Sequence, residues 1–168
     1  GLVEVDNPSA HLLSQRRSNA SGSVVTVTME GARPLLLEVQ ALVTPTHFGT
    51  PQRTASGVDH RRLSILIAVL EKRLGLPLGT QDIFVNAAGG FRLHEPASDL
   101  GIAAAIISSL KDKPVSDKTV FIGEIGLAGE VRDVKNTGPR IREAGRLGFT
   151  RMILPSGCLK SLENNVNL

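Results

Sequence analysis

The chain has 168 residues, of which 41% are hydrophobic and 21% are charged. This length suits one domain with a short arm, because two full domains would each be undersized, and the composition argues against wholesale disorder. Five Phe, no Tyr and no Trp argue strongly against a protein that binds nucleic acid by stacking bases on exposed rings. Any nucleic acid would have to be held by charge, which the formal net charge of +3 permits.

The rest of the composition is typical of an intracellular protein. A single cysteine, Cys158, cannot form an internal disulfide or a cysteine-rich zinc site. No apolar run approaches the roughly 20 residues that cross a bilayer, and the first residues lack a basic region followed by an apolar one. No close metal-ligand spacing is present among the four histidines, His11, His47, His60 and His94. We therefore expect a cytoplasmic protein with no metal site and no contact with a membrane.

The first half of the chain predicts a connector, a β-hairpin and a helix. Residues 1–22 are polar and irregular, which is typical of a flexible arm. Two apolar, partly alternating runs at 24–29 and 35–43 predict the hairpin, and a strand or extended segment follows at 52–57. An amphipathic helix is predicted over residues 59–74 from the apolar stripe Leu63, Leu66, Ile67, Leu70 and Leu74. Asp59 can cap this helix, and Gly75 can end it.

The second half alternates strands with helices. After a short strand at 82–86, residues 98–110 predict a helix whose alanines indicate close packing against a sheet. A further helix runs from Asn136 or Thr137 to Leu147, and strands are predicted at 119–122, 130–134 and 151–154. The expected fold class is therefore mixed α/β (α+β), with an opening hairpin, a mixed sheet and about three packed helices.

Two segments carry the most specific information. Residues 95–103 (EPASDLGIA) form a loop that enters a helix, and residues 123–131 (GEIGLAGEV) form a glycine-spaced link that precedes a basic helix. Together they resemble the proteolytic domain of the Lon family. This resemblance implies a Lon-like fold over residues 23–168, with a catalytic serine at the start of the first of these helices and a catalytic lysine at the start of the second.

The two catalytic residues of that family are missing from the matching positions. In Lon chemistry a neutral lysine removes the proton of the nucleophilic serine. Alignment on Gly101 places Asp99 at the serine position, and counting forward from Gly123 places Gly138 at the lysine position. A displaced dyad of Ser98 and Lys135 is the alternative, but neighbouring helical residues point about 100° apart. We therefore expect Ser98 to be a helix N-cap and Asp99 to stabilise the first turn through the helix dipole.

Several further segments resemble the C-terminal Lon-like domain of the RadA (Sms) family of bacterial and plant-organelle recombination and repair proteins. The matching segments span nearly the whole chain: residues 7–10 (NPSA), 21–24 (SGSV), 38–43 (EVQALV), 57–63 (GVDHRRL), 98–100 and 123–130. The resemblance implies a longer parent protein with a zinc finger and a RecA-like ATPase upstream, in which residues 1–22 would be the connecting arm.

The same resemblance implies a hexameric ring that moves on DNA at recombination intermediates, performs branch migration and works with a RecA-type recombinase. ATP, Mg²⁺ and Zn²⁺ are expected only in the upstream domains, because this sequence has no G-x-x-x-x-G-K-[ST] loop and no C-x-x-C knuckle. We expect no cofactor in the present chain. The location implied is the bacterial cytosol or a plant organelle.

Basic charge is concentrated in two parts of the chain, residues 51–75 and 111–168. In the first, extended guanidinium and ammonium groups could contact phosphates, and the predicted DNA-binding residues are Arg53, Arg61, Arg62, Lys72 and Arg73. Pairing with acids across a subunit interface, or plain solvation, are the alternatives. A solvated helix surface is expected for the second group, Lys135, Arg140, Arg142 and Arg146.

These patterns lead to one leading hypothesis and two alternatives. We expect a Lon-like module that does not cleave peptides, assembles into a ring and contacts DNA through its phosphates. The first alternative is an active serine peptidase that uses the displaced residues Ser98 and Lys135. The second alternative is a pure oligomerisation module in which DNA is held elsewhere. Cys158 is expected to be a packing residue under all three hypotheses.

Overall fold

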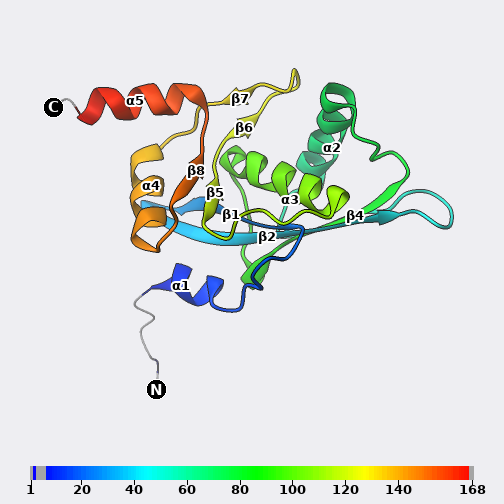
Figure 1. The fold of residues 1–168 in the computed structure, drawn as a ribbon, viewed down its shortest axis with the longest axis horizontal. Helices are drawn as coiled ribbons and strands as arrows, with labels where there is room; N and C mark the ends of the chain where they lie inside the picture. Colours follow the sequence, from blue (N-terminus) through cyan, green and yellow to red (C-terminus); the bar gives the residue numbers. More distant parts are fainter. Residues whose placement is uncertain (1, 3–6, 167–168) are drawn as a thin grey trace.

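Six strands form a mixed sheet in the order β3-β4-β2-β1-β5-β8 in the computed structural model, which describes residues 2 and 7–166 (Figure 1). Antiparallel pairs join β1 to β2 and β2 to β4, whereas β3–β4, β1–β5 and β5–β8 are parallel. The strands are β1 (Ser23–Glu30), β2 (Arg33–Pro45), β3 (Arg53–Ser56), β4 (Gln81–Ala87), β5 (Thr119–Phe121) and β8 (Arg151–Ile153). A separate two-stranded sheet consists of β6 (Glu124–Ile125) and β7 (Val131–Arg132).

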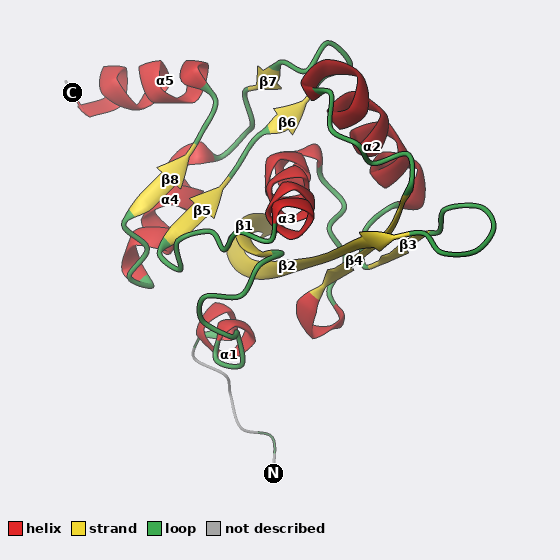
Figure 2. Cartoon of the chain, turned by 45° about the vertical axis from the view of Figure 1, so that its right-hand side comes forward, coloured by secondary structure: helices red, strands yellow, loops and turns green. Residues whose placement is uncertain are grey.

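Helices pack on both faces of the large sheet. Figure 2 shows α3 on one side of β1 and β2 and α1 on the other. The helices are α1 (Pro8–Leu13), α2 (His60–Leu74), α3 (Asp99–Lys111), α4 (Thr137–Arg146) and α5 (Ser156–Val166). Short 3₁₀ turns at Ala88–Gly90 and Pro96–Ser98 complete the connection from β4 to α3. In the part of the chain that the structure describes, no helix is both long and apolar enough to cross a membrane.

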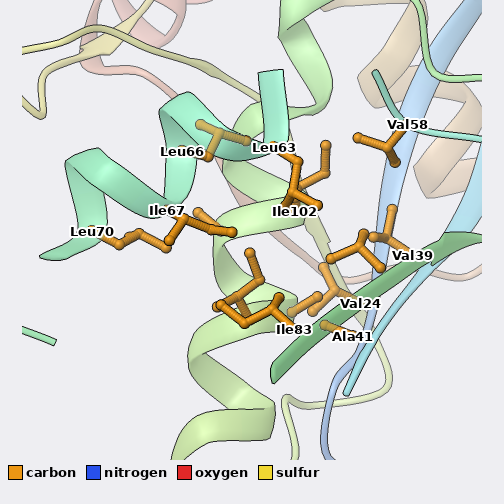
Figure 3. Packing of buried hydrophobic residues seen from close by; sticks show 14 of the residues in the cluster. Val24, Val39, Ala41, Val58, Leu63, Leu66, Ile67, Leu70, Ile83 and Ile102 are labelled. Atoms are coloured by element: carbon orange, nitrogen blue, oxygen red, sulfur yellow. The ribbon is translucent and has the colours of Figure 1, made fainter. Parts of the chain in front are cut away.

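The larger hydrophobic cluster lies between the sheet and the pair α2 and α3 (Figure 3). Because side chains alternate along a strand, Val24 of β1 and Val39 of β2 point to this face. The predicted stripe supplies the helical side through Leu63, Leu66, Ile67 and Leu70. Its last member, Leu74, is exposed at the end of the helix. Burying a side chain of this size stabilises the fold by about 1.5–3 kcal/mol. The stripe thus fixes the position of α2 against α3.

A second cluster fills the opposite face. Val25, Val27 and Leu36, which alternate with the residues of the first cluster, pack there with Ala144 of α4 and with Phe149. Both faces of β1 and of the first half of β2 are therefore buried, and this part of the sheet is sandwiched between helices. This arrangement confirms the mixed α/β class and the opening hairpin.

The predicted elements around α2 are confirmed in detail. The Asp59 side chain accepts a hydrogen bond from the backbone N–H of Arg62 at 2.8 Å, as an N-cap does. Gly75 ends the helix with φ of 65°, a left-handed conformation that glycine adopts without a steric penalty. The predicted strands and helices from β3 to β8 are also present, and β6 adds a strand within the link predicted over 123–129.

Two helices were not predicted. The expected irregular arm contains α1, because Asn7 caps it by accepting from the N–H of Ala10 at 3.1 Å and Pro8 stands in its first turn. Ser9 then accepts a hydrogen bond from the backbone N–H of Leu36 in β2 at 2.9 Å, so this segment packs on the domain. Residues 1 and 3–6 of the predicted arm lie outside the described residues. The other unpredicted helix is α5, in which Cys158 is buried as expected of a packing residue.

Candidate functional site

Asp99 lies at the start of α3, where the resemblance to Lon places the catalytic serine. Its side chain is 1% exposed. One carboxylate oxygen, Oδ1, accepts from Nε of Arg62 at 2.9 Å, and the other, Oδ2, accepts from Nη2 of Arg62 and from the backbone N–H of Ile125. Nη2 of Arg62 also donates to the carbonyl of Ile125 at 2.7 Å. The carboxylate therefore joins α2, α3 and β6 in one hydrogen-bonded ion pair.

This ion pair explains how a carboxylate can be buried at the position. An isolated buried charge is strongly unfavourable, and a bidentate guanidinium partner offsets that cost. The pKa of Arg62 is raised above its ordinary value mainly by the hydrogen bond to Asp99, against an opposing effect of burial. Arg62 is thus committed to an acid of the same chain, a pairing that the sequence did not predict because 37 positions separate the two residues.

Ser98 occupies the N-cap position of α3, as predicted, but it does not act as a capping side chain. Its hydroxyl is buried and makes no hydrogen bond to any described residue. The backbone gives the reason: Ser98 has φ of −82° and ψ of −10°, inside the helical region, whereas a capping residue is normally extended. The 3₁₀ turn at Pro96–Ser98 produces this geometry.

The structure does not join Ser98 to Lys135. Lys135 is exposed, and its backbone carbonyl accepts from Nε of Arg140 at 3.0 Å. Gly138, at the position of the Lon lysine, lies in the first turn of α4 and offers no side chain. The Ser98 hydroxyl lacks the hydrogen bond to a base that would activate it.

Arg140 corrects the prediction of a solvated α4 surface. It is 1% exposed and donates to Oε1 and Oε2 of Glu95 at 2.6 and 2.8 Å and to the carbonyl of Val27 at 2.7 Å. Arg140 shares its helix face with Ala144, four residues later, which packs in the second cluster. This i, i+4 spacing from an apolar residue is the sequence pattern that could have indicated the burial of Arg140. Burial opposes ionisation of Glu95, but the hydrogen bond and attraction from Arg140 outweigh it, and the pKa of Glu95 lies below its ordinary value.

The predicted DNA-binding residues differ in whether their side chains are bound within the chain. Arg53 donates to the backbone carbonyls of Gln81 and Leu78, so its guanidinium is bound within the chain. Arg61 and Lys72 are exposed, but they lie about 16 Å apart along α2, given a rise of 1.5 Å per residue. Arg73 is also exposed and donates to the carbonyl of Leu127 at 3.3 Å. With Arg62 paired to Asp99, the exposed cations are Arg61 at one end of the helix and Lys72 and Arg73 at the other.

A cavity of about 500 Å³ opens beside the Arg62–Asp99 pair. Its size is in the range of small-ligand sites. The lining includes Ser98 and Asp99 from the start of α3, Arg92 and His94 from the preceding loop, and the apolar residues Val58 and Leu93. Among the described residues, no group of three or more His, Cys, Asp or Glu side chains is placed to hold a metal ion. The cavity marks where a Lon-type site would lie, with an ion pair at the position of its nucleophile.

Comparisons with known proteins show what the chain is similar to. A family model described as subunit ChlI of Mg-chelatase matches residues 45–157. The chain is 53% identical over 163 residues to DNA repair protein RadA of Streptococcus pyogenes serotype M3, covering 97% of this chain and 36% of that protein. It is 56% identical over 155 residues to DNA repair protein RadA of Halalkalibacterium halodurans, covering 92% of this chain and 34% of that protein.

A third relative, DNA repair protein RadA of Bacillus subtilis, is 52% identical over 159 residues, covering 95% of this chain and 35% of that protein. The chain thus spans about a third of the length of the curated relatives it matches. The model described as subunit ChlI of Mg-chelatase covers well over half of the chain. The chain therefore belongs to the family described as subunit ChlI of Mg-chelatase, and its sequence corresponds to a segment of the DNA repair proteins named RadA.

Proposed function

We propose that this chain is a non-proteolytic Lon-like domain that acts as an assembly scaffold and contacts DNA in a RadA-type repair protein. The observation that carries the proposal is the ion pair between Arg62 and the buried Asp99. The Asp99 carboxylate stands at the position of the Lon nucleophile, and it is already hydrogen-bonded to Arg62 and to the backbone N–H of Ile125. A carboxylate held by a guanidinium and a backbone N–H is a poor acyl-transfer nucleophile. The names of the relatives support a role in DNA repair.

In this proposal the DNA is held through its phosphates. The exposed predicted residues Arg61, Lys72 and Arg73 are available for such contacts, whereas Arg53 and Arg62 serve the fold. Contacts of this kind read no sequence and weaken steeply with salt. They suit a protein that acts on branched or single-stranded intermediates of any sequence.

The proposal includes a larger assembly. Copies of this domain would form a hexameric ring, driven by an upstream RecA-like ATPase that binds ATP and Mg²⁺ and follows a zinc finger. The ring would promote branch migration together with a RecA-type recombinase, in the bacterial cytosol or a plant organelle. Light scattering on the 168-residue chain tests the scaffold: a concentration-dependent oligomer supports it, and a monomer at high micromolar concentration contradicts a self-sufficient ring.

Peptidase activity is the most direct test of the proposed loss of catalysis. We expect the chain to leave casein and short fluorogenic peptides uncleaved over hours, and Ser98→Ala and Lys135→Ala to behave like the parent. Cleavage by the parent that disappears in both variants would establish the displaced dyad and overturn the proposal. The buried, unpartnered Ser98 hydroxyl and the exposed Lys135 support the expected outcome.

DNA contact is tested separately, by fluorescence anisotropy with a labelled duplex and a labelled single strand. We expect binding that weakens as salt rises and that is reduced in an Arg61→Ala, Lys72→Ala, Arg73→Ala variant. If the parent chain binds neither DNA at low salt, the chain is better described as a pure oligomerisation module.

A further inference from the structure

A second group of cations lies near the start of β5. Arg16 does not belong to this group, but its hydrogen bonds hold the segment after α1 in place. The Arg16 guanidinium donates to Oγ of Ser23 at 3.0 Å through Nε and to the carbonyl of Asp117 at 3.0 Å through Nη1. These bonds fasten the segment after α1 to the connection that leads into β5. Arg16 is therefore a structural residue, and its neighbour Arg17, which is exposed, is carried to this end of the sheet.

Lys118 lies near Arg17 on one side and near Arg151 on the other. Arg17 and Lys118 line the same hollow of about 330 Å³, whose floor includes Leu13 and Phe149. The backbone N–H of Arg151 donates to the carbonyl of Lys118 at 3.1 Å, at the point where the parallel strands β5 and β8 begin side by side (Figure 2). Neighbouring strands are about 5 Å apart. Arg151 is paired with Thr119, the residue after Lys118, so the two cations lie at the same end of the sheet, one position apart in register.

Lys111 and Lys113 extend this surface along the connection from α3 to β5. The same connection is held to the segment before β1 by a hydrogen bond from Oγ of Ser21 to Oδ1 of Asp112 at 2.8 Å. We call five exposed cations at this end of the sheet the basic end. They come from separate parts of the chain: Arg17, Lys111, Lys113, Lys118 and Arg151.

In the described part of the chain, the charges of the basic end are not neutralised by ion pairs. Across residues 7–166, none of its five side chains takes part in an ion pair. Two carboxylates lie among them, Asp112 and Asp117, and each accepts a hydrogen bond from a residue before β1. The buried Glu38 accepts from Ser23, which also binds Arg16, so that acid belongs with the structural arginine. Five free cations against two acids leave a positive surface.

We propose that the basic end is a second contact surface for DNA phosphates, in addition to the exposed cations of α2. The inference rests on the proposed DNA-contacting function and locates a further part of it. Phosphate is favoured over an acidic protein because protein interfaces are built around buried apolar and aromatic residues. The exposed large hydrophobic side chains of the described chain lie on other segments: Leu2, Leu42, Phe48, Leu74, Leu127, Val131 and Leu159.

Three substitutions test the basic end while leaving its anchor in place. The variant Arg17→Ala, Lys118→Ala, Arg151→Ala keeps Arg16, and a thermal melt verifies that it folds. The matched control, Arg33→Ala, Arg132→Ala, Arg142→Ala, removes the same net charge from exposed positions on β2, β7 and α4. Both are compared with the parent 168-residue chain in anisotropy titrations of a labelled duplex and a labelled single strand between 50 and 200 mM salt.

We expect the basic-end variant to bind DNA roughly tenfold or more weakly at 50 mM salt. The slope of log affinity against log salt should become shallower by about 2 to 3, since each lost phosphate contact removes about 0.7 to 0.9. The control variant should bind within about threefold of the parent, because only the general charge effect is lost. This difference between the two variants supports the basic end as a contact surface.

Each contrary result has a distinct meaning. A parent chain that binds DNA with an unchanged affinity in the basic-end variant overturns this inference and leaves the proposed function standing. A parent chain that binds no DNA overturns both. Equal weakening in the two variants shows a general charge effect and also overturns the basic end. Tighter binding of polyglutamate than of DNA at the same salt would assign the surface to an acidic protein instead.

Discussion

The two basic regions of the molecule differ in how their charges relate to the fold. Arg53, Arg61 and Arg62 are close in sequence, yet the structure uses Arg53 to bind backbone carbonyls and Arg62 to neutralise Asp99. The basic end is the reverse case, because its members are scattered from Arg17 to Arg151 and come together only in the folded chain. Charge density along a sequence therefore indicates a binding surface only where the fold does not require those charges.

Removing Arg62 should give the largest effect on stability. Arg62→Ala leaves the Asp99 carboxylate buried without its partner, and we expect the free energy of unfolding to fall by about 3 kcal/mol or more. Its neighbour Arg61 is exposed, and Arg61→Ala should change stability by less than about 0.5 kcal/mol. Urea unfolding of the two variants measures the difference. Equal losses of stability would remove the distinction between a structural and a surface arginine.

The second buried pair predicts a similar but smaller effect. Glu95→Ala leaves the guanidinium of Arg140 buried, although Glu95 itself is 28% exposed, and should cost about 2–3 kcal/mol. The control is Glu143→Ala, which breaks the surface pair with Arg146 and should cost much less stability than Glu95→Ala. A Glu95→Ala variant as stable as the Glu143→Ala variant in urea would show that the α4 contact is dispensable.

The same pair predicts a dependence on pH. Because the pKa of Glu95 is lower in the folded chain than its ordinary value of 4.5, its ionised form stabilises the fold at pH values above that number. This stability is lost as the pH falls from about 4.5 through the lower folded value. Melting temperatures of the parent and of Glu95→Gln should therefore converge as the solution is acidified. Parallel pH profiles for the two proteins would contradict the ionised pair.

Ser98→Ala should have a small effect although the residue is buried. The Ser98 hydroxyl is buried and has no hydrogen-bond partner among the described residues. Its removal eliminates an unsatisfied group, so we expect stability to change by less than about 1 kcal/mol or to rise. Ser9→Ala is the contrasting variant, because it removes the buried acceptor of the Leu36 N–H and should cost about 1–3 kcal/mol. Thermal melts compare them, and a larger loss in Ser98→Ala would indicate that its hydroxyl has a partner.

Sequence reasoning located the elements that carry a local pattern. The leucine stripe with Asp59 and Gly75 at its ends defined α2, because helix caps and a 3.6-residue period are properties of neighbouring residues. The short helix α1 has no such period, and its stability comes from contacts such as that between Ser9 and Leu36. The Arg62–Asp99 and Arg140–Glu95 pairs likewise depend on tertiary packing. Alignment placed Asp99 at the site, but its partner could be found only in the folded structure.

Arg62 serves the fold by pairing with Asp99, and a double-mutant cycle in urea measures the strength of that pairing. Arg62→Met removes the guanidinium, and Asp99→Asn removes the charge while keeping an oxygen that can accept from the Ile125 N–H. We predict a coupling free energy of about 2 kcal/mol or more between the two substitutions. A coupling below about 0.5 kcal/mol would show that the two residues act independently and would contradict a structural role of the pair.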